Sequence, residues 1–173
     1  MPMIVGATAG SRLDDKPNLV KYDSALNKTM KNAYDGKKET SFKPPASRLP
    51  WIAFYLRGSI TAVGISINTT IDLNDCIIQA GSNDDIEDYT NYPDIPNEVQ
   101  LKNPVMKSRI KKERNGFQTA VFQKPVPAKI ISIEYEPEAK GKYVFEVYEA
   151  VVLIEKVCLI FSIMLLGLDI HQI

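Results

Sequence analysis

Short runs of β-branched and aromatic residues dominate the pattern of hydrophobic and polar positions along the chain. Every second residue is apolar at Ile65 and Ile67, and again at Ile131, Ile133 and Tyr135, which is the alternation of a half-buried strand. Residues with turn chemistry, such as Asn, Asp, Gly and Pro, separate the runs. The pattern therefore predicts strands over 51–56, 60–68, 75–80, 119–122, 128–135 and 142–154.

Helical patterns are scarce by comparison. We expect turns of helix only at 24–33, before Asp35-Gly36, and in an apolar segment near the end of the sequence. Several short strands with turns between them favour an antiparallel sandwich or barrel over βαβ units. The hydrophobic pattern therefore indicates an all-β chain.

The apolar segment Val157–Leu168 is shorter than the roughly 20 residues that a membrane span requires. Extending it upstream would place Glu155 and Lys156 in the hydrocarbon, at a cost of a few kcal/mol each. Three interpretations remain open for this segment: a docked helix, an oligomer contact, or a truncated membrane anchor. At the other end, no basic stretch is followed by an apolar one, so the sequence as written shows no secretory signal.

Composition narrows the functional classes. The 173 residues are 45% hydrophobic, which is enough to form a folded core, and the 21 basic residues balance 21 acidic ones. A formal charge of zero gives no overall attraction to nucleic acid or to an anionic membrane, and we expect no nucleic-acid partner.

The chain's one histidine, His171, is too close to the end for a histidine metal centre or a Ser-His-Asp triad within the body of the chain. A glycosidase needs two carboxylates facing one cleft, and the acidic pairs of this sequence fall in expected loops. We therefore predict a protein that is not an enzyme.

Two segments stand out by charge. Asn83–Glu98 carries six acidic residues and no basic one, whereas Lys107–Arg114 carries five basic residues and one acidic residue. The simplest interpretation of both segments is a pair of solvated loops with weakly paired charges. The functional alternative is that the basic run contacts an anion or a phosphate.

Two further features leave alternatives open. Cys76 and Cys158 are too few for a disulfide scaffold or a zinc site, and they form either two buried thiols or one bridge. Asn27 and Asn68 begin N-x-S/T sequons, which accept glycans only in a secreted protein.

Three pieces of sequence together resemble one family. The first is Asn18-Leu19 with Ala25-Leu26-Asn27-Lys28 and Asn32-Ala33-Tyr34-Asp35-Gly36-Lys37, followed by Thr40 and Phe42. The second is Pro50–Leu56 followed by Ile60–Ile65. The third is Gly141–Val144 followed by Val147–Val151. In this order and spacing they resemble the discoidin-like, galactose-binding-domain-like β-sandwiches, and most closely the fucolectin-related branch beside the coagulation-factor type C domains.

This resemblance implies an all-β fold, an antiparallel jelly-roll β-sandwich over 18–155. The remaining residues would form an N-terminal tail over 1–17 and an apolar C-terminal tail over 156–173. It also implies a non-catalytic recognition module that binds carbohydrate or a glycosylated partner in adhesion or innate recognition.

In the fucolectin branch the opening loop wraps a calcium ion, and Ca²⁺ prefers six to eight oxygen ligands. Asp35 would supply a carboxylate, Gly36 would permit the sharp turn, and Lys37 stands where the family usually has asparagine. The positions that the resemblance implies as calcium ligands are Asn32, Asp35, Lys37, Ser47, Tyr148 and Glu149. The alternative is a metal-free turn in which Asp35 caps backbone amides.

Fucose recognition in the resembling lectins uses a histidine and two arginines. This chain has no histidine before His171 and no arginine in the corresponding loop, so the resemblance does not carry fucose specificity over. The polar candidates for ligand binding in that loop are Asn68, Asp72, Asn74 and Asp75.

The resemblance implies an extracellular location, although no signal peptide is present, with an intracellular location as the alternative. Expected partners are a glycan or glycoprotein, a membrane only through the apolar C-terminal tail, and a second copy in an oligomer. The rival function is a protein–protein interaction β-sandwich without metal or sugar binding.

Overall fold

A computed structural model describes residues 3–12, 19–21, 26, 28–82 and 101–155 of the chain. Its elements are β1 (Ile4–Arg12), β2 (Leu19–Lys21), the 3-10 helix η1 (Met30–Ala33), β3 (Leu49–Thr69), the 3-10 helix η2 (Leu73–Asp75), β4 (Cys76–Ser82), β5 (Lys102–Lys112), β6 (Phe117–Tyr135) and β7 (Val147–Ile154). All strand pairings are antiparallel. The predicted all-β class and antiparallel β-sandwich are confirmed.

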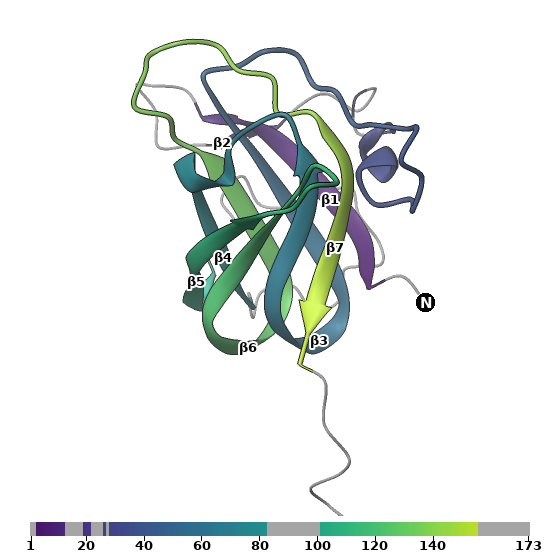
Figure 1. Ribbon diagram of the computed structural model, residues 1–173, viewed down its shortest axis with the longest axis vertical. Helices are drawn as coiled ribbons and strands as arrows, with labels where there is room; N and C mark the ends of the chain where they lie inside the picture. The colour runs from purple at the N-terminus through teal and green to yellow at the C-terminus, as the bar shows by residue number, and fades with distance from the viewer. Residues whose placement is uncertain (1–2, 13–18, 22–25, 27, 83–100, 156–173) are drawn as a thin grey trace, which may run out of the picture.

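The two longest strands, β3 and β6, pair with each other along nearly their whole length (Figure 1). Register shifts interrupt this ladder between Tyr55 and Ile60 and between Ala62 and Gly64. Gly58, with a φ of +66°, lies in the first interruption, in a backbone conformation that side chains disfavour. Bulges of this kind bend a strand, which lets β3 and β6 continue from one layer of the sandwich into the other.

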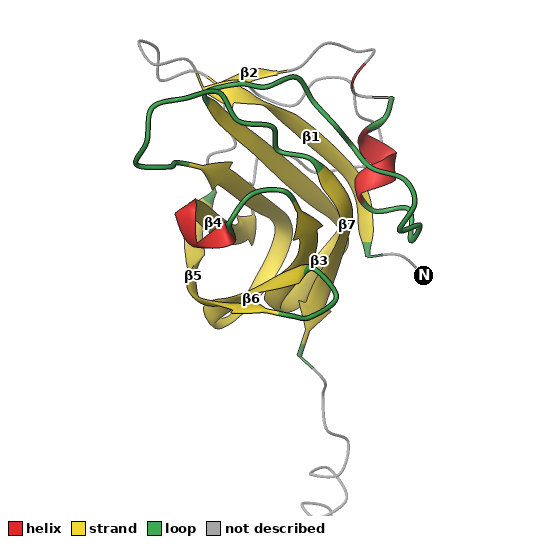
Figure 2. Ribbon diagram, turned by 45° about the horizontal axis from the view of Figure 1, so that its top comes forward, coloured by secondary structure: helices red, strands yellow, loops and turns green. Residues whose placement is uncertain are grey.

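The shorter strands divide between the two halves of these long strands. β1 pairs with residues 49–56 of β3, and β7 pairs with residues 62–69. On the other side, β4 pairs with residues 130–135 of β6, and β5 pairs with both β4 and the first part of β6. The helix η1 lies beside β1 and β7, and η2 lies at the start of β4 (Figure 2).

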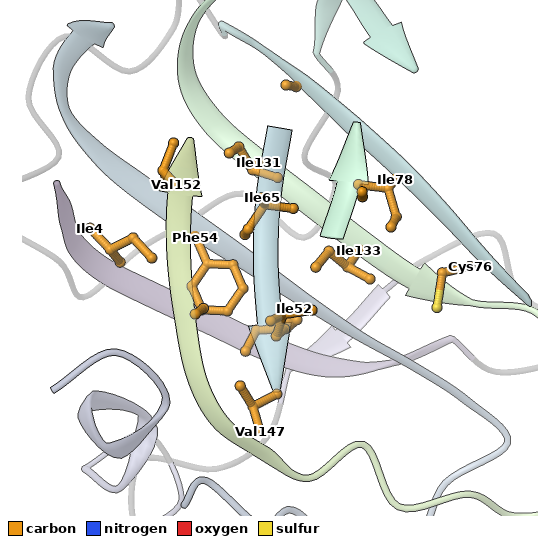
Figure 3. Packing of buried hydrophobic residues seen from close by; sticks show 14 of the residues in the cluster. Ile4, Ile52, Phe54, Ile65, Cys76, Ile78, Ile131, Ile133, Val147 and Val152 are labelled. Carbon is orange, nitrogen blue, oxygen red and sulfur yellow. The ribbon is translucent and has the colours of Figure 1, made fainter. Parts of the chain in front are cut away.

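The main core fills the space between the layers with aliphatic and aromatic side chains (Figure 3). Ile52 and Phe54 of β3 meet Ile131 and Ile133 of β6 there, all at 1% exposure or less. The alternate residues of β3 point the other way, since successive side chains of a strand face opposite sides. Trp51, Ala53 and Tyr55 with Ile130 form a second buried cluster on that side.

Several expected strands are longer or shorter in the structure. The predicted strands 51–56 and 60–68 are one strand, β3, and 119–122 and 128–135 are one strand, β6. The turn residues between them form bulges rather than chain reversals. β7 begins at Val147, not at 142, because residues 136–146 form no strand ladder. Tyr143 makes only an isolated bridge with Ser47, and Glu146 is held by hydrogen bonds from Thr69 and Thr70.

Two expectations about unstructured segments are wrong. The expected tail 1–17 contains β1, whose residues pair with Leu49–Leu56 of β3. The basic run Lys107–Arg114 begins inside β5, which pairs with β6, so it is a strand and the start of a hairpin. Register pairing with a long neighbour outweighs the weak intrinsic strand preference of lysine and glycine.

Some sequence features lie outside the described residues. They are the sequon residue Asn27, the acidic segment Asn83–Glu98, and the apolar tail with Cys158. In the described part of the chain, the expected helical turn is η1, and Cys76 is a buried free thiol. No described helix has the length and apolar character needed to cross a membrane.

Candidate functional site

A polar pocket of about 330 Å³ lies where the β3–β4 connection meets the β5–β6 hairpin. The connection supplies Asp72, and the hairpin supplies Lys112, Phe117 and Gln118. The remaining lining residues are Thr69, Thr70, Ile71, Glu113 and Gly116. The pocket therefore combines a carboxylate, an ammonium group, an amide and an aromatic ring.

Asp72 is the N-cap of η2, and its carboxylate accepts hydrogen bonds from Asn74 and Lys112. Oδ1 accepts from the backbone N–H of Asn74 at 3.0 Å and from its side-chain amide at 2.9 Å, while Lys112 Nζ lies 2.5 Å from Oδ2. These bonds, above all the one from Lys112, hold the pKa of Asp72 below its usual range. Asp72 therefore stays ionised and oriented at neutral pH.

Two side chains of the neighbouring strands, Gln118 and Lys107, bind the backbone of the loop that carries Asp72. Gln118 donates from Nε2 to the Ile71 carbonyl at 2.7 Å and accepts from the Leu73 N–H at 3.0 Å. Lys107 donates to the carbonyls of Leu73 at 2.5 Å and Asn74 at 2.9 Å. The hydrogen bonds from Gln118 and Lys107 thus hold the loop backbone in place, which preorganises the pocket wall.

The structure brings only part of the expected ligand set together. Asp72 lines the pocket, and the Asn68 side chain lies against Gly116 of the facing hairpin. Asn74 and Asp75 are exposed on η2 and do not line the pocket. The backbone of Asp75 instead accepts a hydrogen bond from the Glu136 N–H at 2.9 Å.

The second candidate site is the opening loop, where Asp35 lies after η1. Asp35 Oδ1 accepts a hydrogen bond from the Lys37 N–H at 2.9 Å, and Thr40 Oγ1 lies 3.0 Å from both carboxylate oxygens. Thr40 Oγ1 is also 3.1 Å from the Lys37 carbonyl. Gly36 takes a φ of +77° between them, so the loop folds back and gathers carboxylate, hydroxyl and carbonyl oxygens.

Glu149 of β7 meets this loop from the far end of the chain. Its side chain is 8% exposed, and the N–H groups of Gly36 and Ala150 direct hydrogen bonds at the carboxylate. Oε2 has no hydrogen-bond partner. Burial, together with the nearby charge of Asp35, raises the pKa of Glu149. The carboxylate is therefore buried with unmet bonding capacity.

The other residues of the expected calcium set have separate places. The Asn32 side-chain amide donates to the Ser41 carbonyl at 3.2 Å, and Tyr148 precedes Glu149 on β7. Ser47 forms a two-way backbone bridge with Tyr143, at 2.9 and 2.7 Å, whereas the residue whose hydroxyl reaches Asp35 is Thr40. In the described part of the chain, no three His, Cys, Asp or Glu side chains group as a metal cluster.

No protein-family model and no curated protein matches the sequence. Solved structures do match the fold. A selenomethionine-labelled variant of chitosan-binding module 1, derived from a chitosanase/glucanase of Paenibacillus sp. IK-5, superposes with a TM-score of 0.54 and 16% identity. The match covers 88% of this chain and 98% of that one.

The unsubstituted form of the same module gives a TM-score of 0.53 and 15% identity, covering 87% of this chain and 96% of that one. At this level of identity the likeness concerns the fold. The chain has the β-sandwich of these modules.

Sequence reasoning missed the residues that complete both sites. Lys112 and Gln118 lie on a hairpin more than 35 residues from Asp72, and only strand pairing shows that they face it. Thr40 was closer to detection, since it lies five residues after Asp35 in the same loop. The spacing Asp-Gly-x-x-x-Thr is compatible with one tight loop, and this signal could have selected Thr40 ahead of Ser47.

Proposed function

We propose that the protein is a non-catalytic carbohydrate-recognition module that binds a sugar in the pocket of Asp72, Lys112, Phe117 and Gln118. The observation that carries the proposal is the fixed ion pair of Asp72 and Lys112 in the wall of a pocket beside an aromatic ring. Sugar hydroxyls both donate and accept hydrogen bonds, so a neighbouring carboxylate and ammonium suit them. The aromatic side chain of Phe117 offers an apolar surface for the ring carbons.

The similar solved structures support this proposal through their fold. Both are described as chitosan-binding modules, and a fold acquires its function through the sites that it carries. In this chain the loop pocket has fixed polar groups that the fold itself does not require. A pocket wall held by Gln118 and Lys107 loses little conformational entropy when a ligand binds.

The test is a glycan array followed by titration calorimetry on the best ligand. Asp72→Ala should lose at least roughly tenfold in affinity, since it removes a charged acceptor from the pocket. Asp75→Ala is the matched control, because it removes an exposed carboxylate from the same loop that does not line the pocket. Equal binding by Asp72→Ala and the unsubstituted protein would contradict the pocket assignment.

We also propose a structural calcium ion at Asp35 and Glu149. The donor set fits Ca²⁺, because two carboxylates, a hydroxyl and a carbonyl converge, and Glu149 Oε2 lacks a partner. The oxygens would come from Asp35, the Lys37 carbonyl, Thr40 and Glu149. Such an ion would tie the opening loop to the last strand, and the ammonium groups of Lys37 and Lys38 would moderate its affinity.

Thermal unfolding with millimolar calcium and with chelator tests the calcium site. A ligand of the folded state raises stability by about 3 kcal/mol at a hundred times its dissociation constant. Asp35→Ala should abolish that increase. Glu39→Ala, which removes one exposed carboxylate from the same loop, should retain it. An unchanged unfolding temperature in the unsubstituted protein would remove the metal from the proposal.

A module of this kind would act outside the cell, in adhesion or innate recognition of glycans. An antibody against an exposed epitope, applied to intact and to permeabilised cells, tests the location. Surface staining before permeabilisation is the expected result.

A protein-contact role is the second candidate, and one observation favours it. Among the described residues, the exposed large hydrophobic side chains are Val151 and Ile154, both on the edge strand β7. Exposed edge strands can pair with another chain. Val151→Lys should shift the elution volume in size-exclusion chromatography toward a monomer if β7 forms such a contact, and should leave it unchanged if the protein acts alone.

A further inference from the structure

The five basic residues of Lys107–Arg114 divide into two groups in the structure. Lys107 is bound to the Leu73 and Asn74 carbonyls, and Lys112 is bound to Asp72. The other three, Arg109, Lys111 and Arg114, are exposed and belong to no ion pair in the described part of the chain. We refer to these three side chains as the free cations.

Strand register places two of the free cations on one face. Arg109 lies opposite Val121 of β6 and Lys111 lies opposite Thr119, while Ile110 between them packs on the core. Arg109 and Lys111 therefore point outward from the sheet, about 6.6 Å apart along the strand. Arg114 lies in the hairpin that follows β5, directly after Glu113 and two residues before Gly116, which both line the pocket.

Among the residues that the structure describes, the outward face beside the free cations carries little opposing charge. Moving from β5 across β6 to β3, the outward residues next to Arg109 and Lys111 are Val121, Thr119, Gly64 and Ser66. The nearby acid is Glu113, whose Oε1 accepts a hydrogen bond from the Thr119 hydroxyl at 3.0 Å. Within the described part of the chain, three free cations against one engaged carboxylate leave a net positive strip that ends at the sugar pocket.

We propose that this strip selects an anionic polysaccharide, a glycan chain with a carboxylate or sulfate on successive residues. The inference rests on the proposed sugar pocket and names its ligand class. One sugar would occupy the pocket at Asp72 and Lys112, and the chain would continue along β5, where its anionic groups meet Arg114, Lys111 and Arg109. Planar guanidinium groups bind carboxylate and sulfate through paired N–H donors, so Arg109 and Arg114 supply geometry as well as charge.

A nucleic acid would use the same charges in a different way. Single-strand binding requires aromatic platforms for successive bases. The strip offers no aromatic side chain from Arg109 to Lys111 and its partners on β6, since Phe117 lies at the pocket end. The geometry therefore favours a glycan, whose sugar rings do not need stacking at every residue.

The experiment measures binding of polygalacturonate, dextran sulfate, unsubstituted dextran, neutral oligosaccharides from the array, and a poly-dT oligonucleotide. The variants are Arg109→Gln with Lys111→Gln, Asp72→Ala for the pocket, and Lys140→Gln with Lys142→Gln as a control that removes two exposed lysines elsewhere. Polygalacturonate and dextran sulfate distinguish a carboxylate from a sulfate source. Each titration is repeated at low and at physiological salt.

The strip variant should bind the anionic glycan roughly tenfold more weakly and with a smaller salt dependence, while the Lys140 and Lys142 control stays unchanged. A different result would overturn the strip but retain the pocket. In that case the protein would bind a neutral glycan as well as an anionic one, Asp72→Ala would abolish this binding, and the Arg109 and Lys111 variant would leave it intact. Tighter binding of poly-dT than of either anionic glycan would overturn the glycan assignment. If the unsubstituted protein binds none of these glycans, the proposed function itself is contradicted.

Discussion

The Ser41 hydroxyl donates a 2.7 Å hydrogen bond to Glu146 Oε1, across 105 residues of chain. The same carboxylate lies 3.6 Å from Lys43 Nζ at its other oxygen. The Glu146 backbone carbonyl accepts from the Thr69 hydroxyl at 2.7 Å and from the Thr70 N–H at 3.1 Å. One residue before β7 therefore joins the opening loop to the end of β3.

Ser41→Ala should lower the free energy of unfolding by about 1–3 kcal/mol, because it removes a donor from a buried carboxylate. Denaturant unfolding measures the change as a shift in the midpoint at constant slope. Ser59→Ala is the control, since Ser59 is exposed at the bulge of β3, and it should stay within about 0.5 kcal/mol. Equal effects of the two substitutions would show that the Ser41–Glu146 bond does not stabilise the fold.

Gly64 occupies a position where no side chain fits. A Cβ on this residue would lie 2.4 Å from the backbone carbonyl oxygen of Ala120, an atom that cannot move without breaking the β3–β6 ladder. Gly64→Ala should therefore cost about 1–3 kcal/mol of stability or more, as overpacking does. At Gly58 an added Cβ would meet no atom within 4 Å, so Gly58→Ala should lower stability only through the strained φ of +66°, by about 1 kcal/mol. A smaller cost at Gly64 than at Gly58 would contradict the steric argument.

The sequence predicted the fold class because alternation of apolar residues survives in the strands themselves. Ile65 and Ile67 face the core together, as do Ile131 and Ile133. The sequence did not reveal that the expected strands 51–56 and 60–68 join into one strand. Glycine is common in turns, so Gly58 suggested a chain reversal, whereas in the structure it lies in a bulge of β3. Only the paired strand determines which of the two conformations a glycine supports.

The two carboxylates of the proposed calcium site were predicted through the family resemblance, which joins two distant pieces of sequence. Asp35 and Glu149 both came from that resemblance, and in the structure Glu149 lies beside the loop of Asp35. Lys112 was assigned to a charged loop, because nothing in the sequence pairs a residue of one hairpin with Asp72 of another. Contacts between segments this far apart depend on topology, which a single sequence does not record.

The ion pair of Asp72 and Lys112 should be visible in the titration of Asp72. Its pKa is lowered chiefly by the bond from Lys112, so any stability it contributes is present above the usual pKa range of aspartate and lost as pH falls through the lowered value. Because both side chains are substantially exposed, at 39% and 58%, the effect on stability should be small. Carbon-detected NMR should place the Asp72 midpoint below the usual range and move it upward in Lys112→Met.

Lys111→Met provides the control for that titration, since it removes a neighbouring charge without touching Asp72. The Asp72 midpoint should move less than in Lys112→Met, because only a weak long-range interaction is lost. An equal movement in both variants would indicate a general field effect and not the specific hydrogen bond.

Cys76 should be chemically inert in the folded protein. Burial raises the pKa of its thiol to about 12, and the thiolate is the reactive form. In a Cys158→Ser background, iodoacetamide at pH 8 should label Cys76 far more slowly than it labels a cysteine peptide. Denaturant should restore the ordinary rate, and mass spectrometry follows both reactions. Rapid labelling without denaturant would show that the start of β4 opens readily.

Glu149→Gln should have opposite effects on stability with and without calcium. The pKa of Glu149 is raised by burial, so without metal the fold is less stable at neutral pH, where the carboxylate is charged, than below the usual pKa of glutamate. Glutamine carries no charge and removes that penalty, so in chelator the variant should unfold at a higher temperature than the parent at pH 7. In millimolar calcium the order should reverse, because the variant lacks a carboxylate ligand and loses most of the gain of about 3 kcal/mol expected near saturation.

The pH dependence of the unfolding temperature separates the effect of the buried charge from the effect of calcium binding. In chelator the advantage of Glu149→Gln should shrink as pH falls, since the protonated glutamate of the parent also becomes neutral. Glu138→Gln, at an exposed position, should show neither the calcium effect nor the pH effect. If Glu149→Gln unfolds at a higher temperature than the parent in calcium as well as in chelator, the calcium proposal is contradicted. The buried carboxylate would then lower stability with no metal to offset it, and hydrogen bonds alone would hold the opening loop.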